Sequence, residues 1–119
     1  MKICDFGFAT HCGATKLQAG AIGSPLYMAP ELVRNVPYLG APVDLWALGC
    51  VCYELLHGRF AFKAESIDQL HTRIRKAAHE PISKSLSVPA RQLISSLIVV
   101  PPGSRMSAAD VALLCAKAL

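Results

Sequence analysis

The nearly continuous apolar run from Leu45 to Leu56 is the feature that most constrains the fold of this chain. Leu45, Leu48, Cys52, Leu55 and Leu56 share one helical face, and Trp46, Val51 and Tyr53 make the other faces apolar too. A helix without a polar face is a buried helix, so this run is expected to be the most buried helix of the chain. Asp44 is expected to begin it, and His57-Gly58 to end it with a C-cap glycine. The run includes Glu54 and falls well short of the roughly 20 residues that span a bilayer, which argues against a membrane span.

Three further helices are predicted from their capping signals. The capping box Ser66-x-x-Gln69 opens an amphipathic pattern that fades near Ala78. Pro89 is favoured in a first helical turn, and Ser107-x-x-Asp110 is a second capping-type start. In the helix from Pro89 the inner face is expected at Leu93, Leu97 and Val100, before Pro101-Pro102-Gly103 stops it. The chain is therefore expected to be mainly α, with about four helices, at 44–57, 66–78, 89–100 and 107–118.

The N-terminal part of the chain has a different character. Residues 1–4 are interpreted as the end of a short strand. Gly7, Gly13, Gly20 and Gly23 then punctuate a stretch with neither helical nor strand periodicity, which predicts a loop. A loop longer than about 12–15 residues in a compact domain usually has a function.

Composition excludes several classes of protein. With 119 residues, 53% of them apolar, the chain fits one globular domain or part of one. The net charge of +4 is spread along the chain, and the one tight group, Arg73, Arg75 and Lys76, is expected to be a solvated helix end rather than a nucleic-acid stripe. Five cysteines without a Cys-x-x-Cys pair favour reduced core thiols in a cytoplasmic protein. The four histidines lack metal-ligand spacing.

Four motifs occur in a meaningful order. Asp5-Phe6-Gly7 is followed by Gly-Ser-Pro-Leu-Tyr-Met-Ala-Pro-Glu at 23–31, by Asp44-Leu45-Trp46, and by Arg105 in a Pro-Pro-Gly-Ser-Arg stretch. This order resembles a eukaryotic serine/threonine protein kinase from its Asp-Phe-Gly motif onward. Within that family the chain is most similar to the Unc-51-like and Fused-type kinases. The resemblance implies a partial kinase C-lobe, with an activation segment at 1–31 and a helical remainder at 32–119.

The resemblance implies a cofactor site at the first motif. Asp5 would bind Mg²⁺ that bridges the phosphates of ATP, because a hard cation prefers carboxylate oxygens. Phe6 would pack under the site, and Gly7 would give the backbone room to turn. A plain turn aspartate is the structural alternative for Asp5. No catalytic residue is expected in this chain, because the catalytic-loop aspartate of the family precedes the Asp-Phe-Gly motif.

A substrate site is implied at Gly23, Ser24 and Leu26, which correspond to the loop that meets the substrate residue after the phosphoacceptor. Gly-Ser at this place resembles serine/threonine kinases rather than tyrosine kinases. In the family the hydroxyl contacts the catalytic aspartate and lysine, and a plain turn serine before Pro25 is the alternative interpretation of Ser24.

Four residues are expected to be structural. Glu31 and Arg105 are isolated opposite charges in apolar sequence, and in the family they form a buried ion pair. Asp44 would accept hydrogen bonds from the backbone of the catalytic loop. Trp46 would pack beside the substrate region, with core filler as an equally good reading.

The sequence departs from the family pattern in three places. Gly20 stands nine positions before Ala29, where many kinases have a phosphorylatable threonine, so activation by phosphate there is not expected. Gly-Arg-Phe-Ala-Phe at 58–62 replaces the commoner Gly-x-x-Pro-Phe. Pro101 replaces the aspartate of an Asp-Pro-x-x-Arg motif.

Three interpretations are compatible with these observations. The chain is expected to be a fragment of an ATP-dependent serine/threonine kinase, inactive by itself because the printed sequence lacks the glycine-rich loop, the strand lysine and the catalytic loop. ATP and Mg²⁺ would serve the intact parent and bind this fragment weakly. Protein substrates and regulatory proteins are the expected partners, with no nucleic acid. The alternative is a non-catalytic protein-binding module or truncated pseudokinase, and a decayed gene is a third option.

Overall fold

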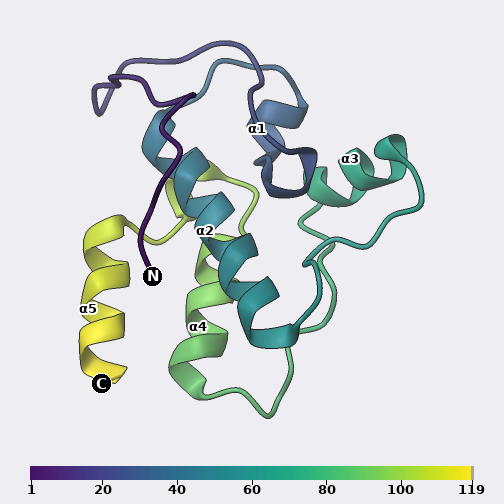
Figure 1. Ribbon diagram of the computed structural model, residues 1–119, viewed down its shortest axis with the longest axis vertical. Helices are drawn as coiled ribbons and strands as arrows, with labels where there is room; N and C mark the ends of the chain where they lie inside the picture. The colour runs from purple at the N-terminus through teal and green to yellow at the C-terminus, as the bar shows by residue number, and fades with distance from the viewer. Residues whose placement is uncertain (119) are drawn as a thin grey trace.

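A computed structural model describes residues 1–118 of the chain and shows a mainly helical molecule (Figure 1). The predicted mainly α fold is confirmed. The strand predicted at residues 1–4 is wrong: these residues are extended and exposed, and no segment in 1–118 pairs with them. An isolated antiparallel bridge joins Gln18 to Tyr38. The elements in chain order are η1 (Pro25–Tyr27), α1 (Pro30–Val33), α2 (Gly40–His57), α3 (Ile67–Arg75), α4 (Val88–Leu97), η2 (Pro102–Ser104) and α5 (Ala108–Ala118).

Helix α2 is the long central helix, and its end was predicted better than its start. Gly58 has φ 68° and its N–H donates to the Glu54 carbonyl at 2.8 Å, so it is the left-handed C-cap that the sequence indicated. The start lies at Gly40, four residues before Asp44. Asp44 therefore lies within the helix and does not cap it. The Gly-Ala-Pro segment at 40–42 fits a first turn, because proline lacks only an N–H that has no helical partner there.

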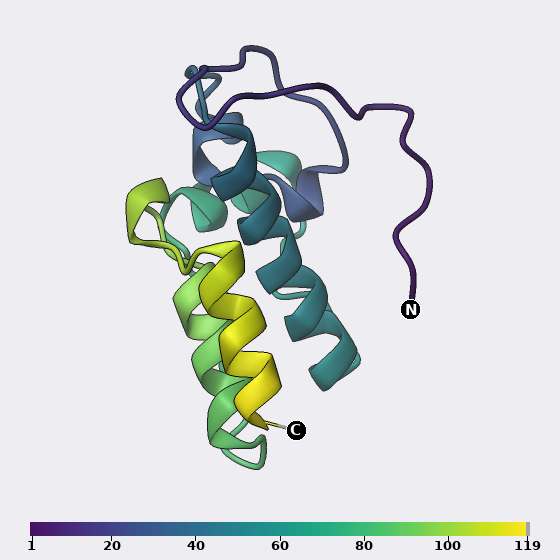
Figure 2. The same cartoon turned by 90° about the vertical axis from the view of Figure 1, so that its left-hand side faces the viewer.

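The all-round burial expected for α2 is wrong for the described residues. Trp46, Gly49, Cys50 and Tyr53 are buried on the side that faces the rest of the chain. On the opposite side Leu48 and Val51 are exposed, and Leu55 reaches 62% exposure. Figure 2 shows α4 and α5 side by side next to α2, which leaves one side of α2 uncovered by the other helices.

The three capping predictions identified real helix starts. In α3 the Ser66 hydroxyl accepts from the Gln69 N–H at 3.1 Å, and the Gln69 side chain accepts from the Glu65 N–H at 2.7 Å. At the start of α5 the Ser107 hydroxyl likewise accepts from the Asp110 N–H at 3.1 Å, and it donates to the Asp110 Oδ2 at 2.7 Å. Two of the helix ends come earlier than predicted: α3 ends at Arg75 rather than near 78, and α4 ends at Leu97 rather than at 100.

The core lies between α2, α3, α4 and η1. Trp46 and Phe62 stack with ring centroids 5.8 Å apart, and both are buried. On α4 the buried residues are Ile94 and Leu97, and Ile98 follows them, while Leu93 and Val100 of the predicted inner face are half-buried. Burial of such side chains contributes roughly 1.5–3 kcal/mol each, so these contacts fix the arrangement of the helices.

Gly49 lies where α2 packs tightly against the end of α4, and its replacement by alanine is expected to destabilise the fold. An added Cβ would lie 2.8 Å from the Leu97 Cβ and 3.0 Å from the Ile98 Cγ1. Overpacking costs about 1–3 kcal/mol, against about 1 kcal/mol gained in helix propensity. Because the 2.8 Å approach is closer than carbon atoms can pack, the cost lies in the upper part of that range, and chemical denaturation of Gly49→Ala should show a free energy of unfolding lower by about 1–2 kcal/mol. Gly103→Ala is the control, because a Cβ there meets no atom within 4 Å. An unchanged or raised stability for Gly49→Ala would contradict the close packing.

Candidate functional site

Glu31 and Arg105 form a buried ion pair that joins distant parts of the chain. Glu31 belongs to α1, and Arg105 follows η2. The two guanidinium nitrogens Nη1 and Nη2 donate to the two carboxylate oxygens at 2.7 and 2.8 Å. The arginine side chain is 0% exposed and the glutamate side chain 8%. The contact predicted from the sequence is present, in the two-pronged geometry that gives charge-assisted hydrogen bonds their strength.

Arg105 uses every N–H of its guanidinium group. Besides the two bonds to Glu31, Nη1 donates to the Pro42 carbonyl at 2.8 Å, Nε to the Val99 carbonyl at 2.8 Å, and Nη2 to the Val100 carbonyl at 3.1 Å. A guanidinium carries five N–H groups, so none is left without a partner. The pair therefore holds α1, the start of α2 and the end of α4 together.

Trp46 completes this cluster from α2. Its side chain is fully buried, and the Arg105 guanidinium carbon lies 5.1 Å from its ring centroid, within the range of a cation–π contact. The indole N–H of Trp46 is buried without a hydrogen-bond partner in residues 1–118. Trp46 thus packs both as core and against the ion pair.

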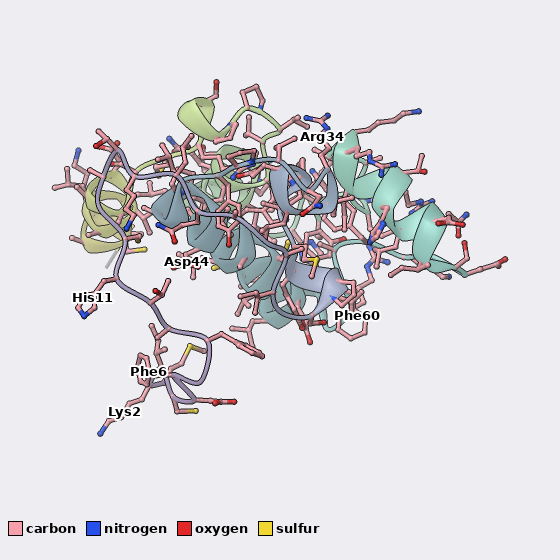
Figure 3. The ribbon with its side chains drawn as sticks, turned by 90° about the horizontal axis from the view of Figure 1, so that it is seen from above. Lys2, Phe6, His11, Arg34, Asp44 and Phe60 are labelled. Carbon is pink, nitrogen blue, oxygen red and sulfur yellow. The ribbon has the colours of Figure 1, made fainter. Side chains whose placement is uncertain are left out.

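Asp44 lies on the exposed side of α2 (Figure 3). Partial burial raises the pKa of its carboxyl group, because desolvation disfavours the charged form. No backbone N–H of residues 1–118 donates to it, so its expected contact with a catalytic loop stays a prediction.

The Asp-Phe-Gly motif lies in an exposed turn away from the helices, and Figure 3 shows Phe6 and Lys2 there. Asp5 has φ 62°, the Ala9 N–H donates to the Phe6 carbonyl at 3.0 Å, and Phe6 is 69% exposed. The packing expected for Phe6 is therefore absent among residues 1–118. At Gly7 an added Cβ would come 3.5 Å from the Asp5 Oδ1, which is an ordinary van der Waals contact.

The one carboxylate of the Asp-Phe-Gly motif, that of Asp5, fits a metal ion that is also bound by the phosphates of a nucleotide. Residues 1–118 contain no group of three or more His, Cys, Asp or Glu that could hold a metal ion by itself. Mg²⁺, however, is commonly bound through one or two carboxylates together with substrate phosphates and waters. The single exposed carboxylate of Asp5 suits that mode of binding.

The predicted substrate residues lie at η1, beside a hollow of about 510 Å³. Gly23 has φ 107°, and the Ser24 carbonyl accepts from the Tyr27 N–H at 3.1 Å, which starts the turn. Leu26 lines the hollow directly, whereas Gly23 and Ser24 are exposed and do not line it. We name this hollow the η1 pocket. Its lining residues are Leu26, Arg59, Phe60, Phe62, Lys63, Ala64 and Glu80.

Most of the η1 pocket was missed by reasoning from the sequence. Arg59, Phe60 and Lys63 belong to the connection between α2 and α3, which the sequence marked only as a departure from a family pattern. The signal available in the sequence was two cations and an aromatic residue within six residues of the end of α2 at His57. Tyr27, next to Leu26 in η1, holds the η1 side of the pocket in place, because its hydroxyl donates to the Glu54 Oε2 of α2 at 2.6 Å. This hydrogen bond raises the pKa of Tyr27 to about 12.

The cysteines of residues 1–118 are free, but the expectation that they are core residues is wrong for Cys4, Cys12 and Cys115, which are exposed. Cys50 is buried in α2, and this burial raises the pKa of its thiol to about 12, so it is an inert core residue. Among the helices of residues 1–118, none is both long and apolar enough to cross a membrane.

The helical fold and the Glu31–Arg105 anchor define the class as the C-lobe of a protein kinase. Residues 1–113 match the protein kinase domain, and the chain belongs to this family. It is 38% identical over 109 residues to the serine/threonine-protein kinase ULK3 of Xenopus laevis, covering 90% of this chain and 23% of that protein. It is 37% identical over 112 residues to the probable serine/threonine-protein kinase nek3 of Dictyostelium discoideum, covering 93% of this chain and 10% of that protein.

The probable serine/threonine-protein kinase HSL1 of Saccharomyces cerevisiae is also similar, at 35% identity over 111 residues, with 93% of this chain and 7% of that protein covered. The chain therefore spans less than a quarter of the length of these relatives. The predicted resemblance to serine/threonine kinases, including an Unc-51-like member, is confirmed.

Proposed function

We propose that this chain is the C-lobe segment of an ATP-dependent kinase whose complete domain transfers the γ-phosphoryl group of ATP to serine or threonine hydroxyls of proteins. The observation that carries the proposal is the buried Glu31–Arg105 pair, in a chain that matches the kinase domain over residues 1–113. This pair ties the end of the N-terminal loop to the last helices. In this proposal residues 1–31 are the activation segment and 32–119 the helical remainder.

Asp5 is the proposed ligand of Mg²⁺, with Phe6 and Gly7 as its neighbours at the ATP site. The family generally uses ATP and Mg²⁺, and the ion would offset the charge on the phosphates. The exposure of Asp5 supports this role, because its carboxylate is free to meet a nucleotide. No reacting group is assigned to this chain.

Gly23, Ser24 and Leu26 are the proposed contacts to a protein substrate. The exposed Ser24 hydroxyl makes no cap hydrogen bond in η1, which leaves it available to other groups. Leu26 borders the η1 pocket, a hollow whose size of about 510 Å³ lies within the ~300–1,000 Å³ typical of ligand sites.

The partners and the location follow from the same proposal. Protein substrates are implied by the family, and regulatory proteins are a second expected class. The dispersed charge of the chain supports no role in nucleic-acid binding. Five free cysteines support a cytoplasmic location, where thiols stay reduced.

The proposal predicts transfer to aliphatic hydroxyls. A protein in which residues 1–119 follow the rest of a kinase domain should transfer labelled phosphate from ATP to peptides that carry serine or threonine, and at least about a hundredfold more slowly to matched tyrosine peptides. Discrimination of this size between acceptors is within what a shaped site achieves. Scintillation counting of the separated peptides gives the rates. A folded domain that labels only the tyrosine peptides, or none, would overturn the proposal.

A further inference from the structure

The η1 pocket has an apolar floor and an open mouth. Leu26 comes from η1, and Phe60 and Phe62 come from the connection between α2 and α3. Phe62 is buried and stacked on Trp46, so core packing holds this part of the floor in place, whereas Phe60 is 48% exposed at the mouth. Figure 3 shows Phe60 beside the η1 turn. A ligand that covers this exposed aromatic ring would remove apolar surface from water, which favours binding.

The mouth of the η1 pocket carries two cations without partners. Arg59 and Lys63 are exposed, and within residues 1–118 neither forms an ion pair. Glu80 also lines the pocket, but its carboxylate is paired with Arg73 of α3 at 3.1 Å, which offsets its charge. The pocket therefore presents a net positive rim above an apolar floor.

We propose that the η1 pocket binds an extended segment of a protein substrate in which one large apolar side chain is flanked by acidic residues. The apolar side chain would lie on Leu26, Phe60 and Phe62, and the acidic neighbours would meet Arg59 and Lys63. Two cations are too few for a nucleic acid, whose binding proteins typically neutralise many more phosphates. This inference rests on the proposed function, because it names the substrate class of the same site.

Direct binding tests the η1 pocket with the 119-residue chain and fluorescein-labelled peptides. The probe has the core Glu-Leu-Glu within Gly-Ser repeats, and the matched probes carry Lys-Leu-Lys, Gln-Leu-Gln or Glu-Ser-Glu. Fluorescence anisotropy at low salt should give the tightest binding for Glu-Leu-Glu. About tenfold weaker binding is expected for each matched probe, because rim charges and the buried apolar group each contribute. Rising salt should weaken the Glu-Leu-Glu probe most.

Charge reversal at the rim provides the matched variants. The double variant Arg59→Glu/Lys63→Glu should weaken Glu-Leu-Glu binding about tenfold and should strengthen Lys-Leu-Lys binding. Lys117→Glu makes a single charge reversal on the exposed surface of α5, outside the pocket, and should change neither. Arg59, Lys63 and Lys117 are all exposed, so neither variant should disturb the core. Circular dichroism is the check that each variant is folded.

Three results would overturn the inference. They are equal binding of the acidic and basic probes, unchanged binding by the double variant, and tighter binding of a labelled oligonucleotide than of the Glu-Leu-Glu peptide. Peptide binding needs no nucleotide, so its failure is separable from that of the proposed function. Selective peptide binding without phosphate transfer by a complete domain would refute the kinase activity and leave the pocket assignment intact. Phosphate transfer by a complete domain, without selective peptide binding, would support the kinase activity and refute the pocket assignment.

Discussion

Replacement of Arg105 by alanine is expected to lower the free energy of unfolding by about 3–5 kcal/mol, because it leaves the Glu31 carboxylate buried without its counter-charge. Glu31 is only 6% exposed, so water cannot replace the lost partner without a rearrangement of α1. The carbonyls of Pro42, Val99 and Val100 lose donors in the same step. The Trp46 ring also loses the guanidinium that lies 5.1 Å from its centroid.

Chemical denaturation followed by far-ultraviolet circular dichroism measures this loss. Arg105→Lys keeps the charge but not the planar fork, and should fall between the wild type and the alanine variant. Arg59→Ala removes an exposed arginine and should stay within about 0.5 kcal/mol of the wild type. The double variant Glu31→Met/Arg105→Met should recover much of the loss, since an apolar pair leaves no buried charge. A loss below about 1 kcal/mol for Arg105→Ala would show that the pair is not an anchor.

The features predicted best from the sequence were those set by local chemistry. Ser66 and Ser107 cap helices because each hydroxyl accepts a hydrogen bond from the backbone N–H three residues further along. This contact is local, so it does not depend on distant parts of the chain. Gly58 ends α2 because it takes a left-handed conformation without steric cost. The Glu31–Arg105 contact spans the chain, and it was predicted from two lone opposite charges in apolar sequence together with the buried ion pair that the resemblance to the kinase family implies.

The features that the sequence did not reveal depend on tertiary context. The four residues of α1 are too few to give a periodic signal, and the extended start of α2 at Gly40 carries no side-chain cap. Apolar residues on every side of α2 predicted complete burial, but burial depends on what covers each face, and Leu55 has no cover among the described residues. The η1 pocket combines residues from positions 26 to 80, which no local pattern brings together.

Replacement of Asp5 by asparagine in a complete domain that contains residues 1–119 is expected to reduce phosphate transfer about a thousandfold. Asparagine keeps the shape of the side chain but loses the negative charge that Mg²⁺ prefers. Loss of one electrostatic contact to the transition state typically lowers the rate by a factor of about 10²–10³. The rate of labelled-phosphate transfer to a serine peptide is the readout. Asp68→Asn, at an exposed position in the first turn of α3, is the control and should retain the wild-type rate. A partial rescue of Asp5→Asn by raised Mg²⁺ would support a metal-ligand role, and a wild-type rate would refute it.

The 119-residue chain alone is expected to show neither ATP binding at micromolar concentration nor phosphate transfer. Phosphoryl transfer depends almost wholly on positioning and on charge stabilisation. In this chain one exposed carboxylate at Asp5 is offered for the metal, and the printed sequence has no glycine-rich loop or catalytic-loop motif to hold the phosphates or the acceptor. Isothermal titration with ATP and Mg²⁺ tests binding, and labelled ATP with a generic serine peptide tests transfer. Transfer by the isolated chain that Asp5→Asn abolishes would mean that these residues carry a complete catalytic site.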